Sequence, residues 1–243
     1  MAEQVATEAF TWMSGGKTPI LIVADHASAH VPDDIDLGID PALLNNHIAV
    51  DIGVAQVAAL LVERLQCSAL LGGVSRLVID LNREETSSGL IPVISDGHKI
   101  AGNEGVDRAA RIARFYHPYH DELTARLSAM AHPFIFSLHS FTPFLKEKPE
   151  EKRPWEIGIL YNQDERAARL AIPMLEEAGA VVGDQQPYSG RILNATMNRH
   201  AEGAGHPYLG VEMRQDISGT SVGQRYYTDL LAPVLEQCRA LLA

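Results

Sequence analysis

Three apolar runs of the chain each end in a side chain that can bind a metal ion or move a proton. PILIVADH ends at His26, FIFSLH ends at His139, and YLGVE ends at Glu212. Taken singly, each is better explained as a hydrogen-bonded structural residue. Ligands in open α/β sheets gather outside the carboxyl ends of the strands, so three adjoining parallel strands would bring these side chains together. Imidazoles and a carboxylate at one point suit metal binding and general base catalysis.

An acidic residue interrupts another apolar stretch. Asp51 lies within HIAVDIGVAQVAALL, which has the spacing of an apolar helix beginning. Burial of an unpaired carboxylate is costly, so a cation, a donor or a metal is expected beside it. Alternatively, Asp51 faces water and favours the helix dipole. His47 lies four residues earlier, on the same predicted helical face, and is a rival ligand.

The segment SRLVIDLNRE places charged and amide side chains around an apolar run. Arg76, Asp80 and Arg83 bracket the predicted strand, and Asn82 precedes the second arginine. Paired guanidinium groups suit bidentate capture of a carboxylate. A surface ion-pair network fits the same spacing equally well. The glycine-rich phosphate motifs and the G-x-S-x-G motif of serine hydrolases are absent from the sequence.

Composition excludes several other functions. The 243 residues include 31 acids and 20 bases, and the net charge of −11 argues against a nucleic-acid partner. Cys67 and Cys238 form no paired-cysteine motif, so any metal must be held by histidine or carboxylate. We find no run of membrane-spanning length and no signal-peptide pattern, and therefore expect a cytoplasmic protein with no membrane partner.

The elements that must position these residues alternate between strands and helices. We expect an α/β fold in a single domain, 1–243, with a mixed, largely parallel central sheet in a three-layer sandwich. Asp40 and Asn103 are predicted helix caps, and Pro118 should kink or divide its helix. The predicted strands span 19–24, 69–73, 76–82, 134–139, 156–161, 180–183 and 208–213; the predicted helices span 41–66, 103–131, 164–178 and 221–241.

Several fragments together resemble the N-formylglutamate amidohydrolase family. VADHAS, HIAVDIGVA, SRLVIDLNR, YHPYHDEL, SLHS and GVEMRQD occur in the order expected for that family, between about residues 19 and 216. SRLVIDLNR is the most specific of them. The family is related in fold to the zinc carboxypeptidases, whose motifs are similar to HSF, to Asn82–Arg83 and to VEMRQD here. The resemblance therefore implies a zinc-carboxypeptidase-like, or phosphorylase/hydrolase-like, fold.

The resemblance also implies a set of metal ligands. His26 and His139 would bind one zinc ion per chain, with Asp51 as the third ligand. Zinc carboxypeptidases carry a glutamate three residues after the first histidine, where this chain has Ala29. Because alanine cannot bind metal, the other two candidates for the third ligand remain His30 and His47.

The remaining implied roles concern proton transfer and substrate binding. Glu212 would be the general base, while Asn82 and Arg83 would hold a substrate carboxylate with Arg76 nearby. In the loop from Tyr188 onward, Arg191 and Arg199 are further candidate contacts, or else solvated loop charges. The other histidines have no implied catalytic role and are expected to be structural or exposed: His98, His117, His120, His132, His200 and His206.

The sequence thus predicts a zinc-dependent amidohydrolase acting on a small N-acyl amino acid, most specifically N-formylglutamate, giving glutamate and formate. The same groups would serve another N-acyl amino acid or a short peptide. A different class of function, a non-catalytic carboxylate-binding protein on the same fold, is kept open by the absence of an acid at Ala29.

Overall fold

The computed structural model describes residues 3–16, 18–145 and 150–242. Within these ranges, the central sheet has eight strands in the order β1-β2-β4-β3-β7-β10-β8-β9, and a small hairpin, β5–β6, stands apart. The run β4-β3-β7-β10 is parallel, as is the pair β8-β9; the other pairs are antiparallel. The strands are β1 (Glu3–Ala6), β2 (Phe10–Ser14), β3 (Ile20–Ala24), β4 (Ser68–Gly72), β5 (Ile94–Ser95), β6 (His98–Lys99), β7 (Phe134–Phe141), β8 (Ile157–Leu160), β9 (Val182–Asp184) and β10 (Tyr208–Arg214).

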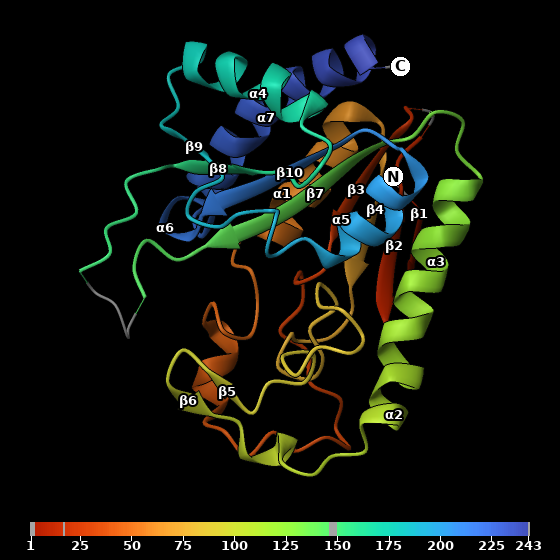
Figure 1. The fold of residues 1–243 in the computed structure, drawn as a ribbon, viewed down its shortest axis with the longest axis vertical. Coiled ribbons are helices and arrows are strands. Elements are labelled where there is room, and N and C mark those ends of the chain that lie inside the picture. The colour runs from red at the N-terminus through yellow and green to blue at the C-terminus, as the bar shows by residue number, and fades with distance from the viewer. Residues whose placement is uncertain (1–2, 17, 146–149, 243) are drawn as a thin grey trace.

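Helices flank the sheet on both sides, which confirms the predicted three-layer α/β architecture. Helices α1, α4 and α7 pack together, and Figure 1 shows α1 behind the sheet and α5 in front of it. None of the described helices combines the length and the apolar character needed to cross a membrane. The helices are η1 (Pro41–Asn45), α1 (Val54–Leu65), η2 (Ala101–Asn103), α2 (Arg108–Arg111), the π-helix η3 (Ile112–Tyr116), α3 (His117–Ser128), α4 (Arg166–Glu177), α5 (Ala195–His200), η4 (Glu202–Ala204), α6 (Gln215–Ser218) and α7 (Ser221–Leu242).

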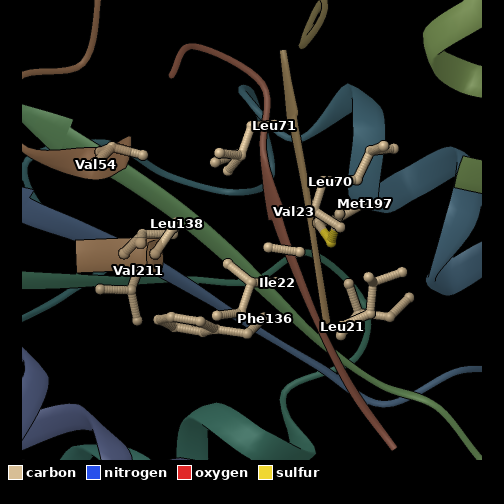
Figure 2. Packing of buried hydrophobic residues seen from close by; sticks show 14 of the residues in the cluster. Leu21, Ile22, Val23, Val54, Leu70, Leu71, Phe136, Leu138, Met197 and Val211 are labelled. Carbon is tan, nitrogen blue, oxygen red and sulfur yellow. The ribbon is translucent and has the colours of Figure 1, made fainter. Parts of the chain in front are cut away.

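The core lies on both faces of the central strands. Figure 2 shows Ile22 and Phe136 towards the side of Val54 in α1, whereas Val23 lies on the opposite side towards Met197 in α5. All five side chains are buried. Alternate residues of a strand point to opposite faces. A strand buried on both faces is therefore apolar throughout, which is why these runs were recognisable in the sequence.

The predicted helix at 41–66 is interrupted, and Asp51 lies in the interruption. Asp40 caps η1, as predicted, but the α-helical geometry begins only with α1. Gly53 precedes α1 with a φ of 83°, a left-handed conformation that a right-handed helix cannot include. His47 and Asp51 consequently do not share a helical face, and that part of the prediction was wrong.

The apolar run at 76–82 is buried but forms no strand. The carbonyl oxygen of Ser75 accepts from the N–H groups of Val78 at 2.8 Å and Ile79 at 3.3 Å, so the chain turns here. A short apolar run can be a buried turn as well as a buried strand, and its pattern does not distinguish them. The edge hairpin β1–β2 was not predicted, because Val5 is 47% exposed and the hairpin carries only a weak apolar pattern.

The predicted helix at 103–131 begins later and changes geometry before Pro118. Asp107, not Asn103, caps it by accepting from Ala110 N–H at 3.0 Å. The α2 segment passes into the π-turn η3 and then into α3, whose first turn contains the proline. Proline has no N–H, so the regular hydrogen-bond ladder must break at this point. The helix is thus divided by a change from α-helical to π-helical geometry, as predicted from the presence of Pro118.

Two buried histidines join α3 to α5. The Nε2 atom of His120 faces the carbonyl oxygen of Leu81 at 3.1 Å, and its Nδ1 lies 2.9 Å from Nε2 of His200. A carbonyl only accepts, so His120 donates through Nε2 and accepts from His200 through Nδ1. Burial lowers the pKa of His120 to about 3 and that of His200 to about 4. Both imidazoles are therefore neutral in the folded chain near neutral pH.

We expect Gly53→Ala to destabilise the fold strongly. A Cβ atom at Gly53 would lie 2.1 Å from the backbone oxygen of Ser218, in addition to the strain of a positive φ. Gly179→Ala is the matched control, because Gly179 has a φ of 90° and its Cβ would meet nothing within 4 Å. Urea unfolding should show about 1–2 kcal/mol lost in the control and clearly more at Gly53. Equal losses of unfolding free energy in the two variants would show that a Cβ atom at Gly53 does not clash with Ser218.

The histidine pair should make the fold less stable in mild acid. In the unfolded chain both residues titrate near pH 6.5. As the pH falls below that value, the two histidines bind protons in the unfolded state but not in the folded state. The free energy of unfolding therefore falls as the pH falls. His200→Gln keeps a donor for His120. Between pH 7 and 5 the variant should lose about 2 kcal/mol less than the parent chain in urea unfolding. His132→Asn, at an exposed position, should retain the parent's pH dependence.

Candidate active site

The three strands that end in ligating side chains are parallel neighbours. The order β3-β7-β10 places His26, just after β3, beside the carboxyl end of β7 with His139. Glu212 on β10 is the register partner of His139. Side chains directly opposite one another on adjacent strands project to the same face. The sequence predicted that these three side chains would meet if their strands were neighbours, and the strands are neighbours.

His26, Asp51 and His139 form a buried group whose ligand atoms lie within 4.8 Å of one another. Oδ2 of Asp51 is 3.4 Å from Nδ1 of His26 and 2.9 Å from Nδ1 of His139. Ligand atoms at the usual zinc distances lie about 3.3 Å apart in a tetrahedron. Nδ1 of His26 is buried and has no hydrogen-bond partner among the described residues. The donor set and its spacing thus fit a zinc ion.

The rival third ligands lie elsewhere. His30 is exposed and does not line the pocket described below. His47 lines that pocket but pairs with Asp96 at 3.2 Å through its Nε2. Asp51 reaches the histidines because its own N–H donates to the carbonyl oxygen of His26 at 2.9 Å, which ties the two loops together.

Each of the two histidines also faces a second carboxylate. Nε2 of His26 lies 2.6 Å from Oδ1 of Asp80, and Nε2 of His139 lies 3.4 Å from Oδ2 of Asp25. A carboxylate on the far nitrogen fixes the orientation of a metal-binding imidazole and makes it a better donor. Sequence reasoning grouped Asp80 with the arginines and missed Asp25. The fragment VADHAS carried the only signal, an acid next to His26.

The buried charges of this group depend on one another. Burial alone would raise the pKa of Asp51, but the charges of His26 and His139 and the hydrogen bond with His139 hold that pKa well below its usual range. Burial would lower the pKa of His139, yet the nearby carboxylate of Asp25 and the hydrogen bond to Asp51 raise it well above its usual value. Protons on the imidazoles thus balance the carboxylates. A divalent cation can replace those protons, since metal binding releases them.

Glu212 differs from the other acids because it is buried with few compensating partners. Its Oε2 atom is buried and has no hydrogen-bond partner among the described residues. Burial raises the pKa of Glu212 to about 7, assisted by the charge of Asp51 and opposed mainly by that of His139. A carboxyl group with a pKa close to neutral can both take up and release a proton at physiological pH.

The proposed ligands and Glu212 line one cavity of about 180 Å³. Arg76 lines it while bonding to Oδ2 of Asp80 at 2.8 Å and lying 3.4 Å from Oδ1 of Asp51. Arg83 also lines it, with Nε 3.6 Å from Asp80 and a side chain that is 36% exposed. Asn82 uses its Oδ1 to accept from Thr196 N–H at 3.0 Å, which leaves its amide N–H groups for the cavity.

The structure places the two predicted loop arginines outside this cavity. Arg191 is exposed and Arg199 lines a separate depression with His200. The guanidinium of Arg199 lies 5.9 Å from the centre of the Tyr116 ring. Thr196 and His200 are on the buried face of α5, whereas Arg199 is exposed. Arg199 therefore lies away from the buried group of His26, Asp51 and His139. The alternative interpretation, loop charges away from the site, fits these two positions.

Arg153 is a further candidate that sequence reasoning passed over. Its side chain is buried, and Nη1 donates to the carbonyl oxygen of Thr142 at 3.1 Å and to the hydroxyl of Tyr188 at 3.0 Å. Within the described ranges no carboxylate pairs with this guanidinium. Thr142 and Tyr188 both line the cavity. A buried unpaired cation is costly, so its place beside the cavity points to an anionic ligand. In the sequence it lay within a charged segment, typical of an exposed loop.

Comparisons with known proteins agree with these features. The model of the N-formylglutamate amidohydrolase family matches residues 18–218. The crystal structure of the gene product Atu2144 from Agrobacterium tumefaciens is 30% identical with a TM-score of 0.90, covering 96% of each chain. N-formylglutamate amidohydrolase from Ralstonia eutropha JMP134 shares the fold at 18% identity and a TM-score of 0.72, covering 96% of this chain and 99% of its own. None of the curated proteins matches the sequence significantly. The chain belongs to the N-formylglutamate amidohydrolase family, and it is a hydrolase that acts on a carbon–nitrogen bond.

Proposed function

We propose that this enzyme is a zinc-dependent amidohydrolase that cleaves N-formylglutamate to glutamate and formate. The observation that carries the proposal is the buried group of His26, Asp51 and His139, which has the spacing of zinc ligands and opens onto the same cavity as Glu212. When bound there, zinc would polarise the amide carbonyl and make a water molecule more acidic. Membership of the family supports cleavage of a carbon–nitrogen bond. The spacing of the two histidines and Asp51 supports zinc as the metal.

Glu212 is proposed as the group that moves the proton. It takes a proton from the attacking water and later delivers it to the leaving nitrogen, which needs a carboxyl group with a pKa close to neutral. Arg76 lines the same cavity beside Asp51, and its guanidinium is suited to stabilise the oxyanion that forms as the carbonyl is attacked.

Two separate cationic positions suit a substrate with two carboxylates. Arg83, with the amide of Asn82, is proposed to hold one of them, as the family resemblance implies. Arg153, acting with the hydroxyl of Tyr188, is proposed to hold the second. An amino acid with one carboxylate would leave the buried Arg153 without a carboxylate partner among the described residues, whereas glutamate would pair both arginines. This argument favours a glutamate derivative over other N-acyl amino acids.

We expect about one zinc ion per purified chain and its loss in His139→Ala. Removal of one of three ligands weakens binding severely, and the lost ion should be measurable by elemental analysis after dialysis. Glu212→Gln is the matched control, because it changes the same cavity without removing a proposed ligand and should retain the ion. Equal zinc content in His139→Ala and the parent would contradict the ligand set. A parent chain that takes up no metal would favour a non-catalytic binding protein.

Glu212→Gln should retain metal and fold while kcat falls about 10²- to 10⁴-fold, the usual contribution of general base catalysis. The glutamine amide is close to the carboxyl group in size but cannot accept the proton. Initial rates of formate release from N-formylglutamate would measure the effect. Activity within twofold of the parent would show that another group is the base.

Arg153→Met should weaken the preference for N-formylglutamate over N-formylglutamine. The methionine keeps the buried stem but removes the charge, so KM should rise about tenfold or more for the first substrate and little for the second. Tyr188→Phe should change KM in the same direction by a smaller factor. A similar rise in KM for both substrates would contradict a role of Arg153 at the side-chain carboxylate, the group that N-formylglutamine lacks.

A further inference from the structure

The loop that carries Asn82 and Arg83 is held by a helix rather than by a sheet. The segment 81–87 pairs with no strand among the described residues. Its backbone carbonyl groups instead accept from side chains of the helical run α2–η3–α3. Arg108 donates to the oxygens of Glu85 and Ser87, Tyr116 to that of Arg83, and His120 to that of Leu81.

The π-turn brings these donors onto one face of the helix. Arg111, which donates to the oxygen of Val78 at 3.0 Å, and Tyr116 are five residues apart. In a regular α-helix five residues advance about 500°, which would turn Tyr116 about 140° away from Arg111. In η3 the N–H of His117 bonds to the oxygen of Ile112, so one turn contains an extra residue. The extra residue returns Tyr116 towards the face of Arg111, and π-turns of this kind are frequent at functional sites.

Tyr116 contacts the loop at Arg83, the residue to which the proposed function assigns one substrate carboxylate. Its side chain is 2% exposed, and its hydroxyl donates to the carbonyl oxygen of Arg83 at 2.9 Å. Among the residues that the structure describes, the Arg83 guanidinium pairs only with Asp80, through a 3.6 Å contact from its Nε. The direction in which the arginine side chain leaves the backbone therefore depends on how firmly its peptide group is fixed.

We propose that Tyr116, presented by the π-turn, is a positioning residue that sets the affinity for the substrate carboxylate by fixing the backbone of Arg83. The inference rests on the proposed function, in which Arg83 binds that carboxylate. Tyr116 itself does not line the cavity. Its effect passes through one hydrogen bond, so the loss of that bond should weaken substrate binding while the reacting groups stay in place.

A double-mutant cycle of Tyr116→Phe and Arg83→Ala tests the inference with N-formylglutamate. Tyr116→Phe alone should raise KM about threefold to tenfold, as expected for one hydrogen bond, with kcat within twofold of the parent. Arg83→Ala alone should raise KM further. In the Arg83→Ala background, Tyr116→Phe should change KM by less than twofold. The same factor in both backgrounds, or no change in the parent background, would overturn the positioning role and leave the proposed function standing.

If Arg83→Ala leaves KM unchanged, both the carboxylate role of Arg83 and the positioning role of Tyr116 are wrong. Tyr227→Phe is the matched control for lost stability. Tyr227 is also buried; its hydroxyl donates to the backbone carbonyl oxygen of Glu156 at 2.5 Å and accepts from the N–H of Arg214 at 3.0 Å. Tyr227→Phe should therefore destabilise the fold in urea by at least as much as Tyr116→Phe but leave KM unchanged. A rise in KM equal to that of Tyr116→Phe would assign the effect to general destabilisation.

Discussion

The structure depends on the burial of three carboxylates around two imidazoles. Asp25, Asp51 and Asp80 are each at most 4% exposed, and His26 and His139 lie between them. Ionised groups withdrawn from water must be paired and hydrogen-bonded, or the fold loses several kcal/mol for each one. A cation at the centre, whether protons on the histidines or a zinc ion, satisfies part of this requirement. The surrounding chain supplies the rest.

The irregular segments are arranged to supply those donors. Tyr119 of α3 and Thr196 of α5 donate to Asp25 at 2.8 Å and 3.0 Å. Arg76 and the N–H of Asn82 donate to Asp80 at 2.8 Å and 3.1 Å, from the buried turn that replaces a predicted strand. A strand would have used the N–H of Asn82 in a ladder. The turn leaves it free for the carboxylate.

This distinction explains which features were predictable from the sequence. The strands ending at His26, His139 and Glu212 were recognisable because burial on both faces imposes continuous apolar runs. The loop that carries Asp51 was not, because a helix-like apolar spacing hides the left-handed Gly53. Asp25 could not be assigned, since its function appears only when Tyr119, distant in sequence, reaches it.

Cationic groups beside the cavity must act against the negative charge of the whole chain. A net charge of −11 would repel the proposed substrate with two carboxylates at long range, so it cannot account for the capture of such a substrate. Attraction must come from groups close to the cavity, where the low dielectric strengthens pairing. Arg76 is largely committed to Asp51 and Asp80, whereas Arg83 is loosely held and Arg153 pairs with no described carboxylate. Recognition of a dianion would therefore depend on the last two, and how rigidly each is fixed would decide its contribution. Tyr116, in the π-turn before Pro118, donates to the backbone carbonyl oxygen of Arg83, and the hydroxyl of Tyr188 accepts from Arg153.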